Sequence, residues 1–425
     1  MTEAPATATR RRPSLPALLR DDAVFRSYWS AHTISLFGDQ ISMLAVPLVA
    51  VLVLDAGAAQ MGYLTAAAWL PYLLFSLHAG AWVDRRGRRR RTMIAADVGR
   101  GAVLLSVPLA YAADLLTLPQ LYVVTLAAGA LSVVFSVADT SLFISIVERE
   151  RYLAANSLLN GSRAFSFVAG PSVAGLLVQA LTAPVALVVD ALSFVGSAAF
   201  LGRISPQEVQ TDPEGGSVLT GLRYIRGSAV VWSSLLATAT INFFNFVFFA
   251  LFVLYATRTL GVSAGTLGLV LGAGAVGGLV GSAVTTPLAR RIGVGPAFVV
   301  GCVAFPAPFL LVPLARGSDA VVISLLFLAE FGSGLGVMIL DISAGSIFAA
   351  VIPHRLRSRV SGAYTFANYG VRVVGSLTGG ALGSWIGLRP TLWIATVGGL
   401  AGVLWLLPSP LPRLRELPEP DEVAS

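Results

Sequence analysis

Long runs of apolar residues, separated by short polar breaks, fill most of the 425-residue chain. A helix that crosses a bilayer needs about 20 mainly apolar residues. Counting such runs between the polar breaks gives twelve predicted membrane spans. They lie near residues 27–53, 60–83, 93–113, 119–147, 156–181, 184–202, 229–257, 264–289, 295–315, 319–350, 359–385 and 388–408. The pattern therefore predicts an all-α integral membrane protein.

The longest polar break, residues 203–228, contains prolines and a glycine pair, which are typical of a linker. It divides the spans into an N-terminal six-helix bundle over residues 21–202 and a C-terminal six-helix bundle over residues 229–408. The two ends, 1–20 and 409–425, are rich in proline and polar residues, so we expect loose cytoplasmic segments there.

Arginines decide the predicted orientation. Six of them occupy seven consecutive positions, 85–91, between two apolar runs. Such a block cannot enter hydrocarbon, and short loops rich in Lys and Arg stay in the cytoplasm. With this loop inside, 23 arginines fall in the inner segments and three in the outer loops. We therefore expect both termini in the cytoplasm and an even number of spans.

Composition agrees with the membrane class and excludes several others. The chain is 56% hydrophobic and 12% charged, whereas soluble domains are about 25% charged. The net charge of +7 comes from arginines in short loops, so we expect no nucleic-acid partner. With a single cysteine and three scattered histidines, we expect no disulfide, no metal site and no cofactor. The first span is expected to serve as the insertion signal.

The two halves are weakly alike, which indicates two pseudo-symmetric bundles. A shift of about 205 residues superposes small residues that follow charged turns, and it aligns a weaker copy of the arginine loop with the original. The pairs are Gly170 with Gly375, Gly175 with Gly380, Gly87 with Gly293, and Asp39 with Asn245.

The loop and several spans resemble the major facilitator superfamily of secondary transporters. The loop matches the signature of that family, G-x-x-x-D-R-x-G-R-[RK], at Gly80, Asp84, Arg85, Gly87, Arg88 and Arg89. Gly170, Pro171 and Gly175 resemble the span-five motif of drug–proton antiporters. Gly38-Asp39 and the sequence Asp190-Ala-Leu-Ser-Phe are similar to the branch with macrolide-efflux and siderophore-exporting proteins. One departure is that the fourth span lacks an arginine, where many proton-coupled exporters keep one.

The resemblance implies roles for these motifs. Asp84 can cap the N-terminus of a neighbouring helix. The resemblance implies that this helix is span eleven and that the loop, with Gly80, Arg85, Gly87 and Arg88, is a conformational latch. The other interpretation is that the arginines only set topology. The span-five motif is expected to seal the cavity against leak, or simply to pack helices closely.

Charges inside spans cost about 2.5–3.5 kcal/mol at the helix centre, so each calls for a partner or a function. Asp39 and Glu330 lie near the predicted midplane and are the first candidates for proton coupling. Asp139 and Asp341 are further candidates nearer the cytoplasm, with a helix-packing hydrogen bond as the alternative. Asp97 and Arg100 are three residues apart, which predicts a structural pair on one helix face.

A bulky apolar substrate needs a cavity wall. Asn242, Asn245 and Phe246 in the seventh predicted span are candidates for it, although phenylalanines facing lipid are the common case. The chain is thus predicted to be a monomeric multi-pass protein of the inner (plasma) membrane. It would export a lipophilic small molecule by proton antiport, with the bilayer and the substrate as its partners. The alternatives are a proton-coupled importer and, less favoured, a membrane enzyme or receptor.

Overall fold

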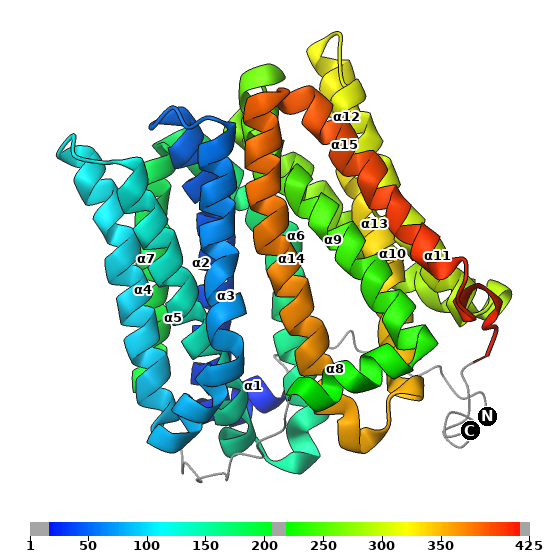
Figure 1. Ribbon diagram of the computed structural model, residues 1–425. Coiled ribbons are helices and arrows are strands. Elements are labelled where there is room, and N and C mark those ends of the chain that lie inside the picture. Colours follow the sequence, from blue (N-terminus) through cyan, green and yellow to red (C-terminus); the bar gives the residue numbers. More distant parts are fainter. Residues whose placement is uncertain (1–16, 206–217, 417–425) are drawn as a thin grey trace, which may run out of the picture.

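Helices make up nearly all of the computed structural model, which describes residues 17–205 and 218–416. Side chains are described throughout these ranges except at residues 17, 76–86, 218–221, 354 and 358. Figure 1 shows two groups of long helices side by side, with the short helix α8 crossing one end.

The first group begins with the short helix α1 and contains six long helical segments. They are α1 (Ala17–Asp21), α2 (Ala23–Leu52), α3 (Ala58–Arg86), α4 (Arg89–Ala112), α5 (Leu118–Ile146), the 3-10 turn η1 (Arg149–Arg151) leading into α6 (Tyr152–Leu181), and α7 (Ala183–Gly202). At the start of α2 the Asp22 carboxylate caps the helix by accepting a hydrogen bond from the Phe25 amide at 2.9 Å.

The second group contains the remaining helices. They are α8 (Val218–Gly227), α9 (Ala229–Leu254) continued by the π-helical η2 (Tyr255–Thr259), α10 (Ala264–Ile292), α11 (Val294–Ala304), η3 (Ala307–Leu310), α12 (Leu311–Leu314), α13 (Asp319–Val351), η4 (His354–Leu356), α14 (Arg357–Trp385), α15 (Leu388–Ala401), η5 (Gly402–Leu406) and η6 (Leu411–Arg413).

Each of the twelve predicted apolar ranges falls on a helical segment. Among the described residues, nine of these helices are long and apolar enough to cross a membrane. The other three are α3, which includes residues whose side chains are not described; α14, which carries polar residues such as Asn368 and Arg372; and α15, which has 14 residues. Membrane crossing by these three stays a prediction.

Three segments differ from the expected pattern. The predicted ninth span is broken into α11, η3 and α12 around Pro306, because proline cannot donate the hydrogen bond that continues a helix. The second half of the predicted linker is helical, and Tyr224 of α8 donates a hydrogen bond to the Val351 carbonyl at 2.8 Å. The predicted loose C-terminus is partly anchored: Leu411 is buried, and the Gly295 amide donates to the Leu414 carbonyl at 2.9 Å.

The bundles meet at two places where a glycine on one helix packs against a glycine on a helix of the other bundle, and we call these places the glycine crossings. Both lie at the end away from α8, the upper end in Figure 1. A Cβ added to Gly62 of α3 would lie 2.7 Å from the Cα of Gly380 of α14. A Cβ added to Gly175 of α6 would lie 2.8 Å from the Cα of Gly268 of α10. The two crossings are related by the internal repeat, since both shifts, Gly62 to Gly268 and Gly175 to Gly380, are close to 205 residues.

An ion pair completes this contact. Arg258 of η2 donates to the carboxylate of Asp55, which follows α2, and to the Val51 carbonyl at 3.3 Å. These three links lie at the same end of the molecule, the end at which α2 finishes and α3 begins. The molecule is therefore closed between its bundles at this end.

Valine at position 175 is expected to separate α6 from α10, since its side chain has no room against the Gly268 backbone. Overpacking of this kind costs roughly 1–3 kcal/mol. Spin labels at Leu115 and Arg316, two exposed sites in loops of opposite bundles, should move apart in the Gly175→Val protein, measured by double electron–electron resonance with Cys302 replaced by alanine.

The matched control is Gly161→Val on the same helix, where an added Cβ meets nothing within 4 Å. Equal label distances in the Gly175→Val, Gly161→Val and unsubstituted proteins would contradict a role for Gly175 in holding the bundles together.

Candidate functional site

A cavity of about 540 Å³ lies beneath the glycine crossings. Its volume is in the range of small-molecule sites. Most of its lining comes from α2, α3, α4 and α5, and the second bundle adds Phe249, Phe252, Val253 and Leu271. The wall is largely apolar, with a concentration of charged and hydroxyl groups on the α2 side.

One face of α2 carries that polar concentration. Tyr28, His32, Ser35, Asp39 and Ser42 recur every three or four residues, the spacing that places side chains on one face of a helix. At 1.5 Å per residue the row extends about 21 Å. Sequence reasoning singled out only Asp39, although this regular spacing within an apolar span is a signal that could have identified the whole row.

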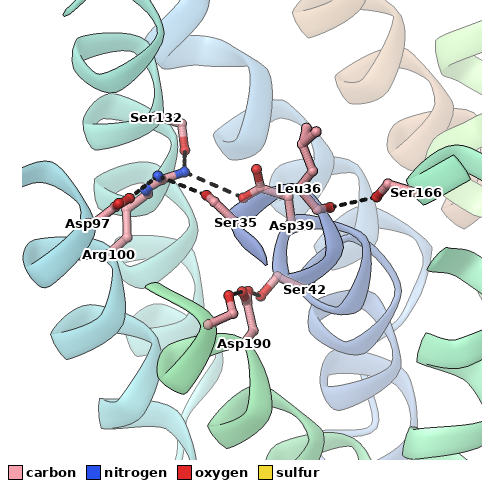
Figure 2. A network of polar contacts seen from close by, with 10 residues as sticks. Ser35, Leu36, Asp39, Ser42, Asp97, Arg100, Ser132, Ser166 and Asp190 are labelled. Carbon is pink, nitrogen blue, oxygen red and sulfur yellow. Dashed lines mark hydrogen bonds and ion pairs between the residues drawn. The ribbon is translucent and has the colours of Figure 1, made fainter. Parts of the chain in front are cut away.

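Arg100 of α4 lies at the centre of the site, between two carboxylates (Figure 2). It forms a hydrogen-bonded ion pair with Asp97, and its Nη1 lies 3.5 Å from the Asp39 carboxylate. Ser35 and Ser132 lie 3.4 Å from its amino groups. The Arg100 side chain is 3% exposed, while 47% of the Asp39 side chain faces open space. Asp39 is thus the accessible member of a buried charged group.

Two aromatic rings complete the surroundings of Arg100. Its guanidinium carbon lies 4.1 Å from the centre of the Phe194 ring and 4.5 Å from that of Phe135, distances typical of cation–π contacts. The pair of Asp97 and Arg100 forms as the three-residue spacing predicts. The sequence did not connect this pair with Asp39, which is 61 residues away from Arg100 in the chain.

Asp190 of α7 is a third carboxyl group in the same region. The Ser42 hydroxyl donates to it, and so does Ser193 at 3.1 Å. Gly38 makes this approach feasible, because a Cβ there would lie 2.1 Å from an Asp190 oxygen. The two motifs that sequence reasoning noted separately, around Gly38 and around Asp190, are therefore in direct contact.

Asp139 of α5 lies beside the polar row of α2, at the part of the row that is nearer to α8. Tyr28 donates a hydrogen bond to it at 2.7 Å, and the Nδ1 of His32 lies 3.7 Å from its other oxygen. The Nε2 of His32 is buried and has no hydrogen-bond partner in the described part of the chain. Asp139 therefore makes the helix-packing bond that was the alternative to a proton role. His32, to which the sequence analysis gave no role, lies on α2 between the position that contacts Asp139 and Asp39.

The two other proton-coupling candidates are not part of this cavity wall. Glu330 of α13 lies against α10, where a Cβ added to Gly274 would be 3.1 Å from its carboxylate. Asp341 is exposed on the same helix. Neither is brought near Asp39 by a hydrogen bond or ion pair among the described residues.

The proposed substrate wall on α9 differs from its expected composition. None of Asn242, Asn245 and Phe246 lines the 540 Å³ cavity. Asn242 instead donates a hydrogen bond to Asn368 of α14 at 3.0 Å, and Phe246 is 7% exposed. Phe249 and Phe252, three and six residues beyond Phe246 on α9, line the cavity instead.

The span-five motif makes close helix contacts on two sides. A Cβ added to Gly170 would lie 2.4 Å from the Gln40 side chain of α2. Gly175 packs against Gly268 where α6 crosses α10, and Pro171 lines the cavity next to that crossing. The motif thus packs helices closely at the closed end of the cavity, a position compatible with both of its expected roles.

The arginine loop is described only in part. Gly87 ends α3 with φ of 57°, a left-handed conformation that glycine adopts at little cost, and exposed Arg88 precedes α4. Its repeat counterpart Gly293 has φ of 99°. The side chains of Asp84 and Arg85 and the surroundings of Gly80 are not among the described parts of the chain, so the latch stays a hypothesis.

No group of three or more His, Cys, Asp or Glu side chains within the described ranges is arranged to hold a metal ion. The chemistry that the site offers is instead that of ion pairing, hydrogen bonding and proton exchange at carboxyl groups beside an apolar cavity.

Comparison with known proteins places this arrangement in a family. Uncharacterized MFS-type transporter YfiS of Bacillus subtilis (strain 168) is 23% identical over 87% of this chain and 89% of its own length. Multidrug efflux pump Tap of Mycobacterium tuberculosis is 30% identical, over 37% of this chain and 38% of its own length.

Solved structures share the fold. A bacterial homologue of the iron transporter ferroportin, in an inward-facing state, superposes with a TM-score of 0.74 at 16% identity, covering 92% of this chain and 99% of that one. The nucleoside transporter NupG has a TM-score of 0.69 at 13% identity, covering 91% and 99%. These relatives are transporters rather than enzymes. The Major Facilitator Superfamily matches residues 28–375 and again 246–424, so the chain is a multi-pass membrane transporter that belongs to this superfamily.

Proposed function

We propose that the protein exports a lipophilic small molecule across the plasma membrane by proton antiport. In this proposal twelve helices cross the membrane, both termini and α8 are cytoplasmic, and a single copy of the chain works by alternating access. The glycine crossings and the Asp55–Arg258 pair then close the extracellular end, so the conformation described here faces inward.

The observation that carries the proposal is the position of Asp39. Two carboxyl groups, of Asp39 and Asp97, share one guanidinium, that of Arg100, and a third, of Asp190, lies nearby against Gly38 and Ser42. Full ionisation would leave uncompensated negative charge in an apolar region, which is costly. A proton on one carboxyl relieves that cost, and Asp39 is the exposed member, whereas Asp97 and Asp190 are fully buried.

Asp39 can therefore link a proton to a substrate. When it is ionised it faces Arg100 and presents a negative group to the cavity; when it is protonated that group is neutral. Protonation from the outside would weaken the hold on a polar or cationic part of the substrate and favour the return of the carrier. The polar row on α2 supports a cytoplasmic exit for the proton, because it leads from Asp39 through Ser35 and His32 toward Asp139.

The lipophilic substrate class rests on the cavity wall, which is mainly apolar and includes Phe249 and Phe252. The partial similarity to a multidrug efflux pump favours export over import. The acids Glu330 and Asp341 remain secondary candidates for proton coupling in the second bundle.

Substitution of the central acid is the direct test. In the Asp39→Asn protein, proton-driven accumulation of a fluorescent lipophilic zwitterion in inside-out vesicles should fall to the level measured with a protonophore, since an amide cannot exchange a proton. Asp114→Asn is the matched control: Asp114 is exposed in the α4–α5 loop and has φ of 55°, which asparagine tolerates. Full gradient-driven transport by the Asp39→Asn protein would exclude this role for Asp39. Accumulation by the unsubstituted protein only in right-side-out vesicles would favour an importer.

Orientation is tested separately by cysteine labelling in the Cys302→Ala background. A cysteine at Leu115 should react with a membrane-impermeant maleimide added to intact cells, whereas a cysteine at Arg223 on α8 should react only after permeabilisation, because the first lies at the closed end and the second at the arginine-rich end. The opposite pattern would refute the proposed topology.

A further inference from the structure

Arg372 of α14 differs from three other arginines of the described helices, each of which has polar partners. Arg100 pairs with Asp97 and Asp39, and Arg258 pairs with Asp55. Arg389 donates to the Tyr255 hydroxyl and the Ala315 carbonyl, both at 2.9 Å. The guanidinium of Arg372 has no hydrogen bond or ion pair with any described residue, and its Nε is buried without a partner.

Aromatic rings surround Arg372 instead. Its guanidinium carbon lies 4.4 Å from the centre of the Trp69 ring, 5.2 Å from that of Phe246 and 5.3 Å from that of Tyr369. Tyr72 extends the group, since the centre of its ring lies 5.6 Å from that of the Tyr369 ring. Cation–π contacts stabilise the charge, but the N–H donors of the guanidinium have no acceptor among the described residues.

This aromatic group joins the two bundles at the edge of the cavity. Trp69 and Tyr72 come from α3 and line the cavity, whereas Tyr369 and Arg372 come from α14 and Phe246 from α9. Arg372 lies 15 residues into α14 and Asp39 lies 16 residues into α2, so the two charges are at similar depth on opposite bundles.

The acid that faces this region from the second bundle is Asp341 of α13. It is exposed, and no ion pair within 4.0 Å joins it to Arg372. The site therefore holds a positive group whose N–H donors can bond to an acceptor on a ligand, next to flat ring surfaces.

We propose that Arg372, Trp69 and Tyr369 form a binding site for a planar aromatic carboxylate, with the guanidinium donating to the carboxylate and the rings stacking on the aromatic body. Arginine matches a carboxylate with two parallel N–H donors, and such charge-assisted bonds are among the strong ones. The inference deepens the proposed function, on which it rests, by naming the class of exported molecule: a lipophilic organic anion, or a zwitterion whose other end faces Asp39.

Binding without any gradient tests this inference independently of proton coupling. The probes are 2-naphthoate, its neutral twin 2-naphthamide and the cation 2-naphthylmethylammonium, titrated into the purified full-length chain in lipid nanodiscs. We expect tightest binding for 2-naphthoate. Arg372→Gln should weaken it at least about tenfold, since a hydrogen bond to a charged group contributes roughly 1.5–3 kcal/mol, and should change 2-naphthamide binding by less than about twofold.

Two further variants keep the test decisive. Arg316→Gln, in the exposed loop before α13, should leave all three affinities unchanged. Arg372→Lys keeps the positive charge without the planar fork, and should bind 2-naphthoate with intermediate affinity even if the glutamine variant folds poorly. Equal binding of the three probes, or equal weakening of all three by Arg372→Gln, would show that Arg372 has only a structural role in linking the bundles. Either result would overturn the proposal. Loss of proton-driven export with anion binding intact would count against the proposed function alone.

Discussion

The close approach of two glycine pairs at one end of the molecule governs how the rest of the structure is arranged. Helices in a bilayer gain no hydrophobic driving force from association, so their contact depends on close packing and interhelical bonds. At Gly62 with Gly380, and at Gly175 with Gly268, any side chain would collide with backbone atoms of the partner helix. These contacts close the interface at one end and define the end of the cavity. Because the internal repeat generates both, the closure is pseudo-symmetric.

The chemistry inside that scaffold is not symmetric. In the first bundle Asp39 faces the cavity beside Arg100, while its repeat counterpart Asn245 is outside the cavity lining. In the second bundle the prominent charge is Arg372, whose counterpart at a shift of 205 residues is Phe167, 61% exposed. The two halves thus share the positions of glycines, which maintain the backbone geometry, and differ in the charged residues beside the cavity. The proposed proton antiport would need such a difference, because it handles two different species.

Much of the fold could be predicted from the chain because span length and charge distribution are local properties. Every predicted apolar range coincides with a helical segment. The departures also have local causes: Pro306 breaks the ninth range, and apolar residues such as Leu222 and Ile225, three apart, make α8 within a stretch that its prolines and glycines marked as a linker. The candidate site was predictable only in part. Asp39 and the Asp97–Arg100 pair were identified, but His32 and Trp69 were not.

The sequence by itself determined the membrane class, the apolar segments, the internal repeat and the signature of the superfamily, since each is written in neighbouring residues or in a fixed period. Only the tertiary structure decided which charges meet. Arg100 and Asp39 are 61 residues apart, Tyr28 and Asp139 are 111 apart, and Ser42 and Asp190 are 148 apart. A strongly apolar helix does not specify its rotation about its own axis, because lipid and protein interior are similarly apolar. Packing against neighbouring helices fixes that rotation, and with it the residues that line the cavity.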